Sequence, residues 1–351
     1  MKNVVVIGTV GLPACYGGFE SLVENLTKHA SQDISYNVFC SSKVYEEKIN
    51  KHNNAKLIYV PLHANGIQSI FYDVFSLVKA LFIKPDVTLI LGVSGCIFLP
   101  LYSFFSKSKI ITNIDGLEWR RDKWGRVAKW FLKFSEEIAV KYSDVVISDN
   151  QAISDYVNDE YGVTSRVIAY GGDHVLPSIY PKLEFEDYFL SLCRIEPENN
   201  VELILEAFSK MDKSLKFVGN WNNSEFGKKL RVYYSKFSNI EMIDPIYDIL
   251  ELFKLRMACK GYVHGHSAGG TNPSLVEAMH FAKPIYAFDC DFNRYSTEES
   301  AIYFSDVNDL IVKLDFLSST TDEAGIGVKM KSIAERRYTW RVIVEEYESL
   351  Y

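Results

Sequence analysis

Short apolar runs recur at intervals along the first half of the chain, and helical segments separate them. The apolar runs lie at 4–8, 36–40, 56–60, 87–92, 109–115 and 144–150. Two of the intervening segments, 20–28 and 67–82, have apolar residues at the spacing of one helix face. Strands that alternate with helices predict a parallel sheet covered on both faces, which is a doubly wound α/β domain.

The second half repeats this pattern after Tyr170, Gly171 and Gly172. Strands are expected at 188–195, 215–220, 240–244, 261–265 and 284–289, and helices at 199–210, 247–258 and 273–282. The simplest description is two doubly wound domains joined near 171–180. In such sheets ligands bind beyond the carboxyl ends of the strands, so function is expected in the loops there.

One uncharged stretch, 87–106, has the length of a membrane span. Gly92, Ser94 and Gly95 interrupt it, and Pro100 opens a second apolar piece with the features of a helix start. We therefore predict a strand, a turn and a buried helix here instead of a transmembrane segment.

Composition narrows the classes of function. The 351 residues include 38 Lys and Arg against 45 Asp and Glu, a formal charge of −7 that disfavours nucleic-acid binding along a broad basic surface. The six cysteines are scattered without a C-x-x-C pair, which fits a reducing cytosol. The apolar part of the start, MKNVVVIGTVG, is too short for a signal peptide, and we expect it to form a buried strand.

The loop at 8–20, which reads GTVGLPACYGGFE, follows the first expected strand and opens a helix. Its glycines let the backbone approach a ligand, and the helix start offers N–H groups to an anion. The glycine spacing is not that of the G-x-G-x-x-G fingerprint, which argues against a nicotinamide-dependent oxidoreductase. A purely structural turn is the alternative.

A second loop, 113–124, concentrates acidic, basic and aromatic residues at the end of a buried strand. Asp115 and Glu118 are candidates to accept hydrogen bonds from hydroxyls, because polar groups at such a position are costly unless they bind something. Three basic residues are candidates to hold a phosphate: Arg120, Arg121 and Lys123. A solvated surface loop is the alternative.

Basic residues are dense around this loop, with nine Lys or Arg against five acids between 101 and 141. Aromatic residues lie among them, namely Trp119, Trp124, Trp130, Phe131 and Phe134. Such a mixture is typical of a patch that lies on a membrane surface, although solvation of an ordinary helix face explains it nearly as well.

The segment 263–279 has the clearest helix-start signature. A strand ends in a Gly-rich turn, Thr271 and Asn272 follow, and Pro273 takes the first helical position. Free amides at such a start can bind a diphosphate, and Glu277, one turn further, can accept two ribose hydroxyls. A purely structural cap is the alternative.

Other loops carry candidate ligands for phosphate or metal. In 193–200 a strand again leads to a helix, and Arg194 is a permanent, bidentate partner for phosphate. The D-x-D sequence at 289–291 is the pattern of a manganese site, but a turn at a strand end explains it better. His264 and His266 lack a third ligand, so we do not predict a metal there.

Together, GLPACYGGFE, DGLEWRRDKW, CRIEPENN and HGHSAGGTNPSLVEAM resemble the retaining GT-B glycosyltransferases of family 4, and within them the bacterial polysaccharide rhamnosyltransferases. The resemblance covers essentially the whole chain. It implies two Rossmann-like domains facing a cleft, an acceptor-side domain over 1–170 and a nucleotide-sugar-binding domain over 171–327. A final helix over about 328–351 is expected to pack back onto the first domain, and a hinge near Gly171 and Gly172 to close the cleft.

The resemblance also implies roles for residues that match the family motifs. Arg194 would hold the donor diphosphate, 269–274 would wrap it, and Glu277 matches the second Glu of the Glu-x7-Glu motif, which binds the ribose. Gly269 stands where the first Glu is usual. Asp115 lies near the position of a His that bonds the donor's 6-hydroxyl, and a 6-deoxy sugar has no such hydroxyl.

The implied catalytic residues are Asp115, Arg194 and Glu277, with Asn199 or Asn200 replacing a Lys that commonly assists the Arg. The implied donor-binding residues are Gly17, Gly18, Arg194, Asn199, His266, Gly269, Gly270, Thr271, Asn272, Ser274, Leu275 and Glu277. The implied acceptor-binding residues are Tyr16, Glu118, Trp119, Arg120, Arg121 and Lys123.

The activity implied is transfer of L-rhamnose from dTDP-β-L-rhamnose to a polyprenyl-diphosphate-linked sugar, as by a β-1,4-rhamnosyltransferase, in the synthesis of a capsule or other cell-surface polysaccharide. The enzyme would be cytoplasmic, peripheral on the inner face of the plasma membrane, and independent of a metal cofactor. Alternatives are the same fold with another donor, a UDP-hexose or UDP-galactofuranose, and a non-catalytic protein that binds a sugar nucleotide.

Overall fold

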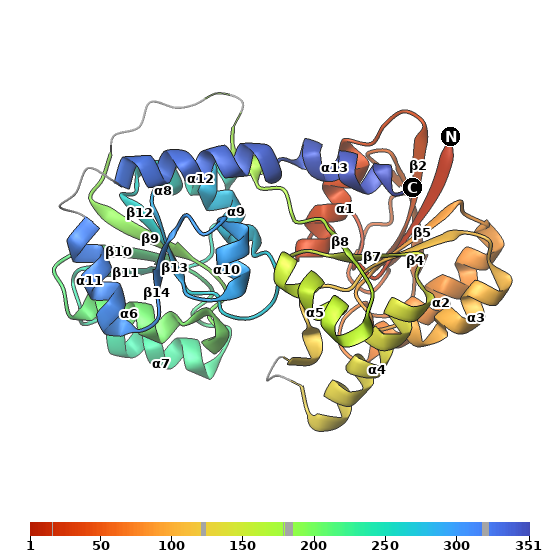
Figure 1. The fold of residues 1–351 in the computed structure, drawn as a ribbon, viewed down its shortest axis with the longest axis horizontal. Coiled ribbons are helices and arrows are strands. Elements are labelled where there is room, and N and C mark those ends of the chain that lie inside the picture. Colours follow the sequence, from red (N-terminus) through yellow and green to blue (C-terminus); the bar gives the residue numbers. More distant parts are fainter. Residues whose placement is uncertain (16, 121–123, 178, 180–184, 318–322) are drawn as a thin grey trace. The chain divides into compact units, whose positions relative to one another are not determined.

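The computed structural model describes residues 1–351 apart from 16, 121–123, 178, 180–184 and 318–322. The chain forms two compact units (Figure 1). Unit 1 consists of residues 1–170 and 340–351, and unit 2 of residues 171–339.

Unit 1 is built on an eight-stranded sheet in the order β3-β4-β2-β1-β5-β6-β7-β8. All its strand pairs are parallel except β3 with β4. The strands are β1 Lys2–Ile7, β2 Ile34–Ser41, β3 Lys51–His52, β4 Ala55–Val60, β5 Val87–Leu91, β6 Lys109–Asn113, β7 Val145–Ser148 and β8 Arg166–Val167.

Helices cover both faces of this sheet. They are α1 Gly18–Lys28, α2 Gln68–Ile83, α3 Leu99–Phe105, α4 Arg126–Tyr142, α5 Gln151–Tyr161 and α13 Trp340–Ser349, with short 3₁₀ turns η1 Cys96–Phe98 and η2 Glu118–Arg120. Crossovers between parallel strands are right-handed, so α2, α3, α4 and α5, which all lead in the same direction across the sheet, lie on one face. On the other face α1 packs against α13 (Figure 1).

The core of unit 1 explains the apolar runs of the sequence. Central parallel strands are buried on both faces, so β1 contributes a continuous run in which Val4, Val5 and Val6 are fully buried. Helix α13 adds Trp340 and Tyr347 to the same core. Residues 340–351 therefore complete unit 1.

Unit 2 has a six-stranded parallel sheet in the order β11-β10-β9-β12-β13-β14. Its strands are β9 Tyr188–Leu192, β10 Ser214–Val218, β11 Ile240–Ile243, β12 Gly261–His264, β13 Ile285–Phe288 and β14 Ile302–Phe304. Its helices are η3 Asp173–Val175, η4 Pro197–Asn199, α6 Val201–Ser209, α7 Glu225–Tyr234, α8 Ile249–Ala258, α9 Pro273–Met279, α10 Asp291–Ser296, α11 Val307–Leu317 and α12 Glu323–Arg337.

The predicted fold class, two doubly wound α/β domains, is confirmed. The stretch 87–106 forms a strand, a turn and a helix (β5, η1 and α3), as expected. The prediction that this helix is buried is wrong, because Leu101, Phe104 and Phe105 are exposed. Within the described residues, no helix has both the length and the apolar composition needed to cross a bilayer.

The expected single helix over about 328–351 is two helices. Helix α12 ends at Arg337 and belongs to unit 2, whereas α13 starts at Trp340 and belongs to unit 1. The break has a tertiary cause, because Tyr338 is buried in unit 2 and its hydroxyl donates to Ser296 O (2.8 Å). Its carbonyl oxygen accepts from Gly172 N at 2.7 Å.

Candidate functional site

The sheet order of unit 2 makes the carboxyl ends of β9 and β12 the candidate ligand site. These two strands are neighbours, and the chain leaves them toward opposite edges of the sheet, which makes this pair the switch point where doubly wound folds bind ligands. The loops after the two strands, 193–200 and 265–272, are two of those singled out from the sequence.

Two asparagines join these loops. The Asn199 side chain donates to Arg194 O (2.7 Å), and its Oδ1 lies 2.7 Å from His266 Nδ1. Asn200 donates to Gly265 O at 2.8 Å. A Cβ on Gly265 would lie 2.2 Å from the Asn199 carbonyl oxygen, so only glycine permits this approach. Asn199, expected to contact the donor, has both polar atoms of its side chain engaged within the loops.

Arg194 follows β9 and keeps its guanidinium accessible. Its side chain is about half exposed (49%), and its Nη2 lies 3.7 Å from Glu196 Oε2. An exposed ion pair this long contributes little to stability, so Arg194 can exchange it for a phosphate at a small cost in free energy.

The start of α9 is capped by the side chain of Asn272. Asn272 Oδ1 accepts from both Ser274 N (3.0 Å) and Ser274 Oγ (2.8 Å), and Leu275 N donates to Asn272 O (3.1 Å). Pro273 has no N–H, so the first three residues of α9 offer no spare amide. Ser274 and Leu275, expected to bind the donor, serve the cap, and the Leu275 side chain is buried.

The loop before the cap supplies amides instead. Within the described residues, no hydrogen bond engages the backbone N–H groups of Gly269 and Gly270. Gly269 has a φ of 110°, and a Cβ there would lie 3.3 Å from His266 Nε2. Thr271 lies buried beside them. Successive amides in such a turn are suited to an anion.

Tyr262 links the start of α9 to the end of β9. Its hydroxyl donates to Leu192 O at 3.0 Å. Burial raises the pKa of Tyr262, and a hydrogen bond with Ser274 acts in the opposite direction. These contacts bring the cap of α9 close to the strand end that Arg194 follows.

Glu277 is the best-anchored side chain of this region. Its Oε2 forms an ion pair with Arg256 Nη2 on α8, and its Oε1 lies 3.4 Å from His174 Nε2. Burial by itself raises the pKa of Glu277, but the Arg256 guanidinium, and His174 with it, hold that pKa below its usual value. A Cβ on Gly172 would lie 2.8 Å from Glu277 N, so the chain can pass α9 closely only with glycine there.

Sequence reasoning missed Arg256 and His174. Arg256 is 3% exposed, and its Nε and Nη1 have no partner among the described residues. In the sequence, Arg256 is an arginine inside an expected helix, and no motif marks it as a functional residue. His174 follows the Gly171–Gly172 turn, for which the sequence predicted a domain junction and a hinge.

His264 within β12 and His266 after it have no third metal-ligating side chain arranged beside them among the described residues. Burial, and after it the neighbouring His266, lower the pKa of His264 far below its usual value, so the ring is neutral. Its Nε2 has no partner among the described residues. Within the described part of the chain, no group of three or more His, Cys, Asp or Glu side chains is arranged to hold a metal ion.

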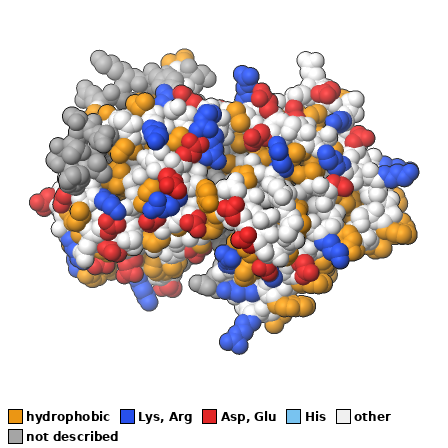
Figure 2. All heavy atoms as spheres, in the orientation of Figure 1, with side chains coloured by type: hydrophobic (Ala, Val, Ile, Leu, Met, Phe, Trp, Pro, Cys, Tyr) orange, Lys and Arg blue, Asp and Glu red, His pale blue; other side chains and the backbone are white. Residues whose placement is uncertain are grey.

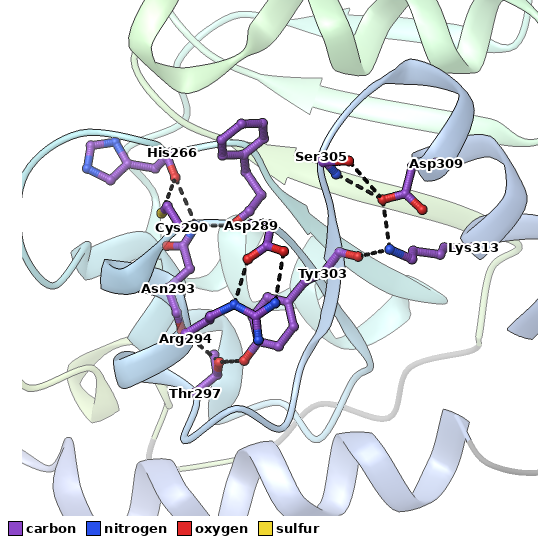
Figure 3. Close-up of polar contacts among 11 residues, drawn as sticks. His266, Asp289, Cys290, Asn293, Arg294, Thr297, Tyr303, Ser305, Asp309 and Lys313 are labelled. Atoms are coloured by element: carbon purple, nitrogen blue, oxygen red, sulfur yellow. Dashed lines mark hydrogen bonds and ion pairs between the residues drawn. The ribbon is translucent and has the colours of Figure 1, made fainter.

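The D-x-D sequence lies at the end of β13, and Figure 3 shows its surroundings. Asp289 accepts from Arg294 Nε (2.6 Å) and Nη2 (2.8 Å), and that guanidinium lies 4.4 Å from the centre of the Tyr303 ring. Asn293 donates to His266 O at 2.8 Å. This cluster thus supports the loop after β12, and the Asp289 carboxylate is used in an ion pair.

In unit 1, Glu20 ties down the loop after β1. Its Oε1 accepts from Thr9 Oγ1 (2.9 Å) and Val10 N (2.7 Å). Gly17 has a φ of 111°, and a Cβ there would lie 2.2 Å from Glu20 Oε2. Gly18 begins α1 and lies near the Tyr170 ring. Gly17 is therefore required by the turn itself, whatever the loop binds.

Asp115 is held at the end of β6 by a short relay. Its N–H donates to Asn113 Oδ1 (3.0 Å), and Asn113 Nδ2 donates to Tyr347 Oη on α13 (2.8 Å). Asp115 has a φ of 61°, a left-handed conformation that Asp and Asn tolerate best after glycine. Residues 340–351 thereby help to fix a predicted catalytic residue.

Some of the residues predicted to bind an acceptor contact other side chains of unit 1. Trp119 donates to Glu136 Oε2 (3.1 Å), and Trp124 donates to Glu118 Oε2 (3.1 Å). The Arg120 guanidinium lies about equally far from the Trp119 and Tyr156 rings, at 5.1 and 5.0 Å. The other three predicted residues, Tyr16, Arg121 and Lys123, lie outside the described residues.

Two comparisons with known protein sequences place the chain among its relatives. Residues 1–173 match a family described as a domain of unknown function, DUF1972. The chain is 22% identical over 380 residues to an uncharacterized glycosyltransferase of Methanocaldococcus jannaschii, an alignment that covers 95% of this chain and 94% of that protein.

Solved structures show the same fold along the whole chain. Sucrose-phosphate synthase from Thermosynechococcus elongatus is similar with a TM-score of 0.82 at 15% identity, covering 100% of this chain and 98% of that one. Anabaena HepE in complex with UDP is similar with a TM-score of 0.75 at 12% identity, covering 99% of each chain. The chain therefore has the fold of the GT-B glycosyltransferases, with two parallel-sheet, Rossmann-like units.

Proposed function

We propose that this protein is a retaining glycosyltransferase that uses a nucleotide sugar as donor. The observation that carries the proposal is the set of groups at the β9–β12 switch point: an accessible Arg194, unengaged amides at Gly269 and Gly270, and an anchored Glu277. A cation and amides suit a diphosphate, and a carboxylate held ionised suits a pair of ribose hydroxyls.

The proposed chemistry follows from these groups. The charge that develops on the departing nucleotide diphosphate is stabilised by the Arg194 guanidinium and the loop amides, so no metal is required for that step. The acceptor hydroxyl attacks from the face that the diphosphate leaves, and the anomeric configuration is retained. Asp115 acts at the acceptor side in this proposal.

The donor we propose is dTDP-β-L-rhamnose, and the acceptor a polyprenyl-diphosphate-linked sugar at the inner face of the plasma membrane. The support is the resemblance of the four sequence motifs to rhamnosyltransferases. A UDP-hexose is the second candidate donor, because the structurally similar Anabaena HepE has been solved with UDP-glucose.

A donor panel tests the activity. The protein is incubated with dTDP-rhamnose, UDP-glucose, UDP-galactose or UDP-galactofuranose and a lipid-diphosphate-linked sugar, and nucleotide release and product mass are followed. Arg194→Ala and Glu277→Ala should each lower turnover by about tenfold or more, which corresponds to about 1.4 kcal/mol of transition-state stabilisation.

The matched controls are Arg341→Ala, whose side chain is 86% exposed on α13, and Glu335→Ala, 60% exposed on α12. Both should turn over like the unchanged protein. Equal turnover in all four variants would refute the site. Donor binding without any transfer would instead identify a sugar-nucleotide-binding protein that is not an enzyme.

A further inference from the structure

Helix α2 exposes apolar side chains where a surface helix normally carries polar ones. Ile67, just before the helix, Phe71, Phe75 and Phe82 are 77%, 63%, 41% and 81% exposed. They are spaced by four, four and seven residues, so they share one side of the helix. The only charged residues of α2 are Asp73, which is buried, and Lys79 on the same outer side. The outward side of α2 is therefore a row of aromatic and aliphatic groups.

The next two helices continue this pattern. On α3, Phe104 and Phe105 are 80% and 65% exposed, and their rings meet edge to face. On α4, Val127 and Trp130 are 81% and 67% exposed, and the Trp130 ring stacks on that of the half-exposed Phe134. Large apolar side chains this exposed, on consecutive helices, mark an interaction surface.

The three helices form one continuous surface, which we call the α2–α4 surface. Helix α3 packs against both α2 and α4, and all three cover the same face of the sheet. In Figure 2, hydrophobic side chains with basic ones among them gather at the right-hand and lower edges, where these helices lie in Figure 1.

The charge of this surface is opposite in sign to that of the chain. Basic side chains border the apolar groups: Lys79, Lys84, Lys107, Lys109, Arg126 and Lys129. Of the acids on the three helices and in the segments that flank them, Asp73 and Glu136 are buried, and Asp86, Glu137 and Asp144 are exposed. Six basic side chains thus stand against three exposed acids. In a protein with a formal charge of −7, such a local excess of cations indicates an anionic partner.

We propose that the α2–α4 surface docks the protein on an anionic lipid bilayer, with the Phe and Trp rings inserted at headgroup depth and the lysines among the phosphates. Aromatic rings favour the interface between hydrocarbon and water, and each basic side chain near the surface adds electrostatic attraction. A symmetric contact with a second copy would bring two basic surfaces together, which disfavours that occupant.

The surface also revises what the sequence predicted. The patch expected around 101–141 included Trp119, but that ring turns inward to Glu136. The phenylalanines of α3, expected in a buried helix, and those of α2 join Trp130 and Phe134 in the apolar part. Docking on lipid stands without the transferase activity, and only its use, delivery of a lipid-linked acceptor, rests on the proposed function.

Co-sedimentation with vesicles tests the proposal without any nucleotide sugar. The full chain is mixed with vesicles of phosphatidylglycerol and phosphatidylcholine, or of phosphatidylcholine alone, at low and high salt. It should bind the anionic vesicles, more weakly at high salt. The double variant Phe104→Ser with Phe105→Ser should bind about tenfold more weakly or worse, because two inserted rings are lost.

Charge reversal, Lys107→Glu with Lys109→Glu, should also weaken binding and reduce its dependence on salt. Controls on α7 of unit 2 are Val232→Ser, of similar exposure to Phe104, and Lys229→Glu. Thermal unfolding confirms that each variant is folded. The proposal fails if the unchanged protein does not bind anionic vesicles. It also fails if the Phe104/Phe105 and Lys107/Lys109 variants bind like the unchanged protein, or if the α7 controls lose binding to the same extent.

Analytical ultracentrifugation of the same variants identifies the competing occupant. The unchanged protein should remain one species across a wide range of concentration. A self-association that Phe104→Ser with Phe105→Ser abolishes, together with no vesicle binding, would assign the α2–α4 surface to contacts between copies of the chain and overturn the lipid proposal.

Discussion

Asp73 on α2 shows how a single buried side chain shapes a loop at a strand end. It is almost fully buried, it accepts a hydrogen bond from Ser94 Oγ, and Gly95 packs against it. Ser94 and Gly95 belong to the loop after β5, next to the loop after β1, at the switch point of the unit 1 sheet. Burial raises the pKa of Asp73 to about 7, although the hydrogen bonds from Ser94 and Gly95 oppose it.

The stability of the protein should therefore depend on pH through Asp73. With a folded-state pKa of about 7 and an ordinary value of 3.8, the folded state binds the proton more tightly. Protonated Asp73 therefore adds to the free energy of unfolding. This stabilisation is complete below about pH 4, declines as the pH rises to about 7, and is lost above that. The side chain of Asp73→Asn does not ionise. As the pH rises from about 4 to 7, its free energy of unfolding should therefore increase by about 2–4 kcal/mol relative to that of the unchanged protein.

Urea unfolding at about pH 4.5 and pH 8 measures this difference, because the free energy of unfolding extrapolates linearly to water. Asp33→Asn, an exposed position in unit 1, is the control and should show no such change. A constant difference between Asp73→Asn and the unchanged protein at both pH values would mean that Asp73 is ionised throughout.

Residues that carry candidate chemistry were predictable, whereas their supporting partners were not. Arg194 and Glu277 stand at strand ends and helix starts that the sequence marks. Arg256 and Asp73 lie inside helices, and their importance comes from burial and from partners distant in sequence. No local pattern encodes such pairs, because buried polar groups find their partners only when the tertiary structure forms.

Among the secondary-structure elements, α13 is short but contacts both the core of unit 1 and the end of β6. It brings Trp340 and Tyr347 into the unit 1 core and, through Asn113, supports Asp115. The sequence predicted a helix here but not its start, because no glycine or proline separates α12 from α13. The break at Tyr338 depends on burial in unit 2, which periodicity cannot reveal. The strands β3, β8 and β14, each two or three residues long, escaped prediction because they are too short to show a pattern.

Removing the Tyr347 hydroxyl should destabilise the protein although the ring stays in place. In Tyr347→Phe the buried Asn113 amide loses its acceptor, which costs about 1–3 kcal/mol in the free energy of unfolding. Trp340→Ala should cost more, about 3–5 kcal/mol, because it leaves a cavity. Urea unfolding measures both, with Tyr233→Phe on the surface of α7 as control. Equal stability of Tyr347→Phe and Tyr233→Phe would contradict the role of the relay.

For the whole molecule, the decisive feature is the route of the chain through the two units. Unit 2 is continuous, residues 171–339, whereas unit 1 is assembled from 1–170 and 340–351. Each unit has its own sheet and its own hydrophobic core. In principle a continuous unit with its own core can fold by itself.

Fragments should reproduce this difference. Residues 171–339 alone should unfold in one cooperative thermal transition, whereas 1–170 alone should not, since its core lacks Trp340 and Tyr347. Joining 1–170 to 340–351 through a Gly-Ser linker should restore cooperativity. If 1–170 melts as sharply without α13 as with it, the helix is dispensable for unit 1.

This route has a consequence for synthesis on the ribosome. Domains usually fold in the order in which they are translated, amino-terminal part first. Here the first-translated sheet emerges early, but its core stays incomplete until residues 340–351 have left the exit tunnel. The unit encoded second can reach its native state first, and the nascent chain meanwhile presents an apolar surface that chaperones recognise.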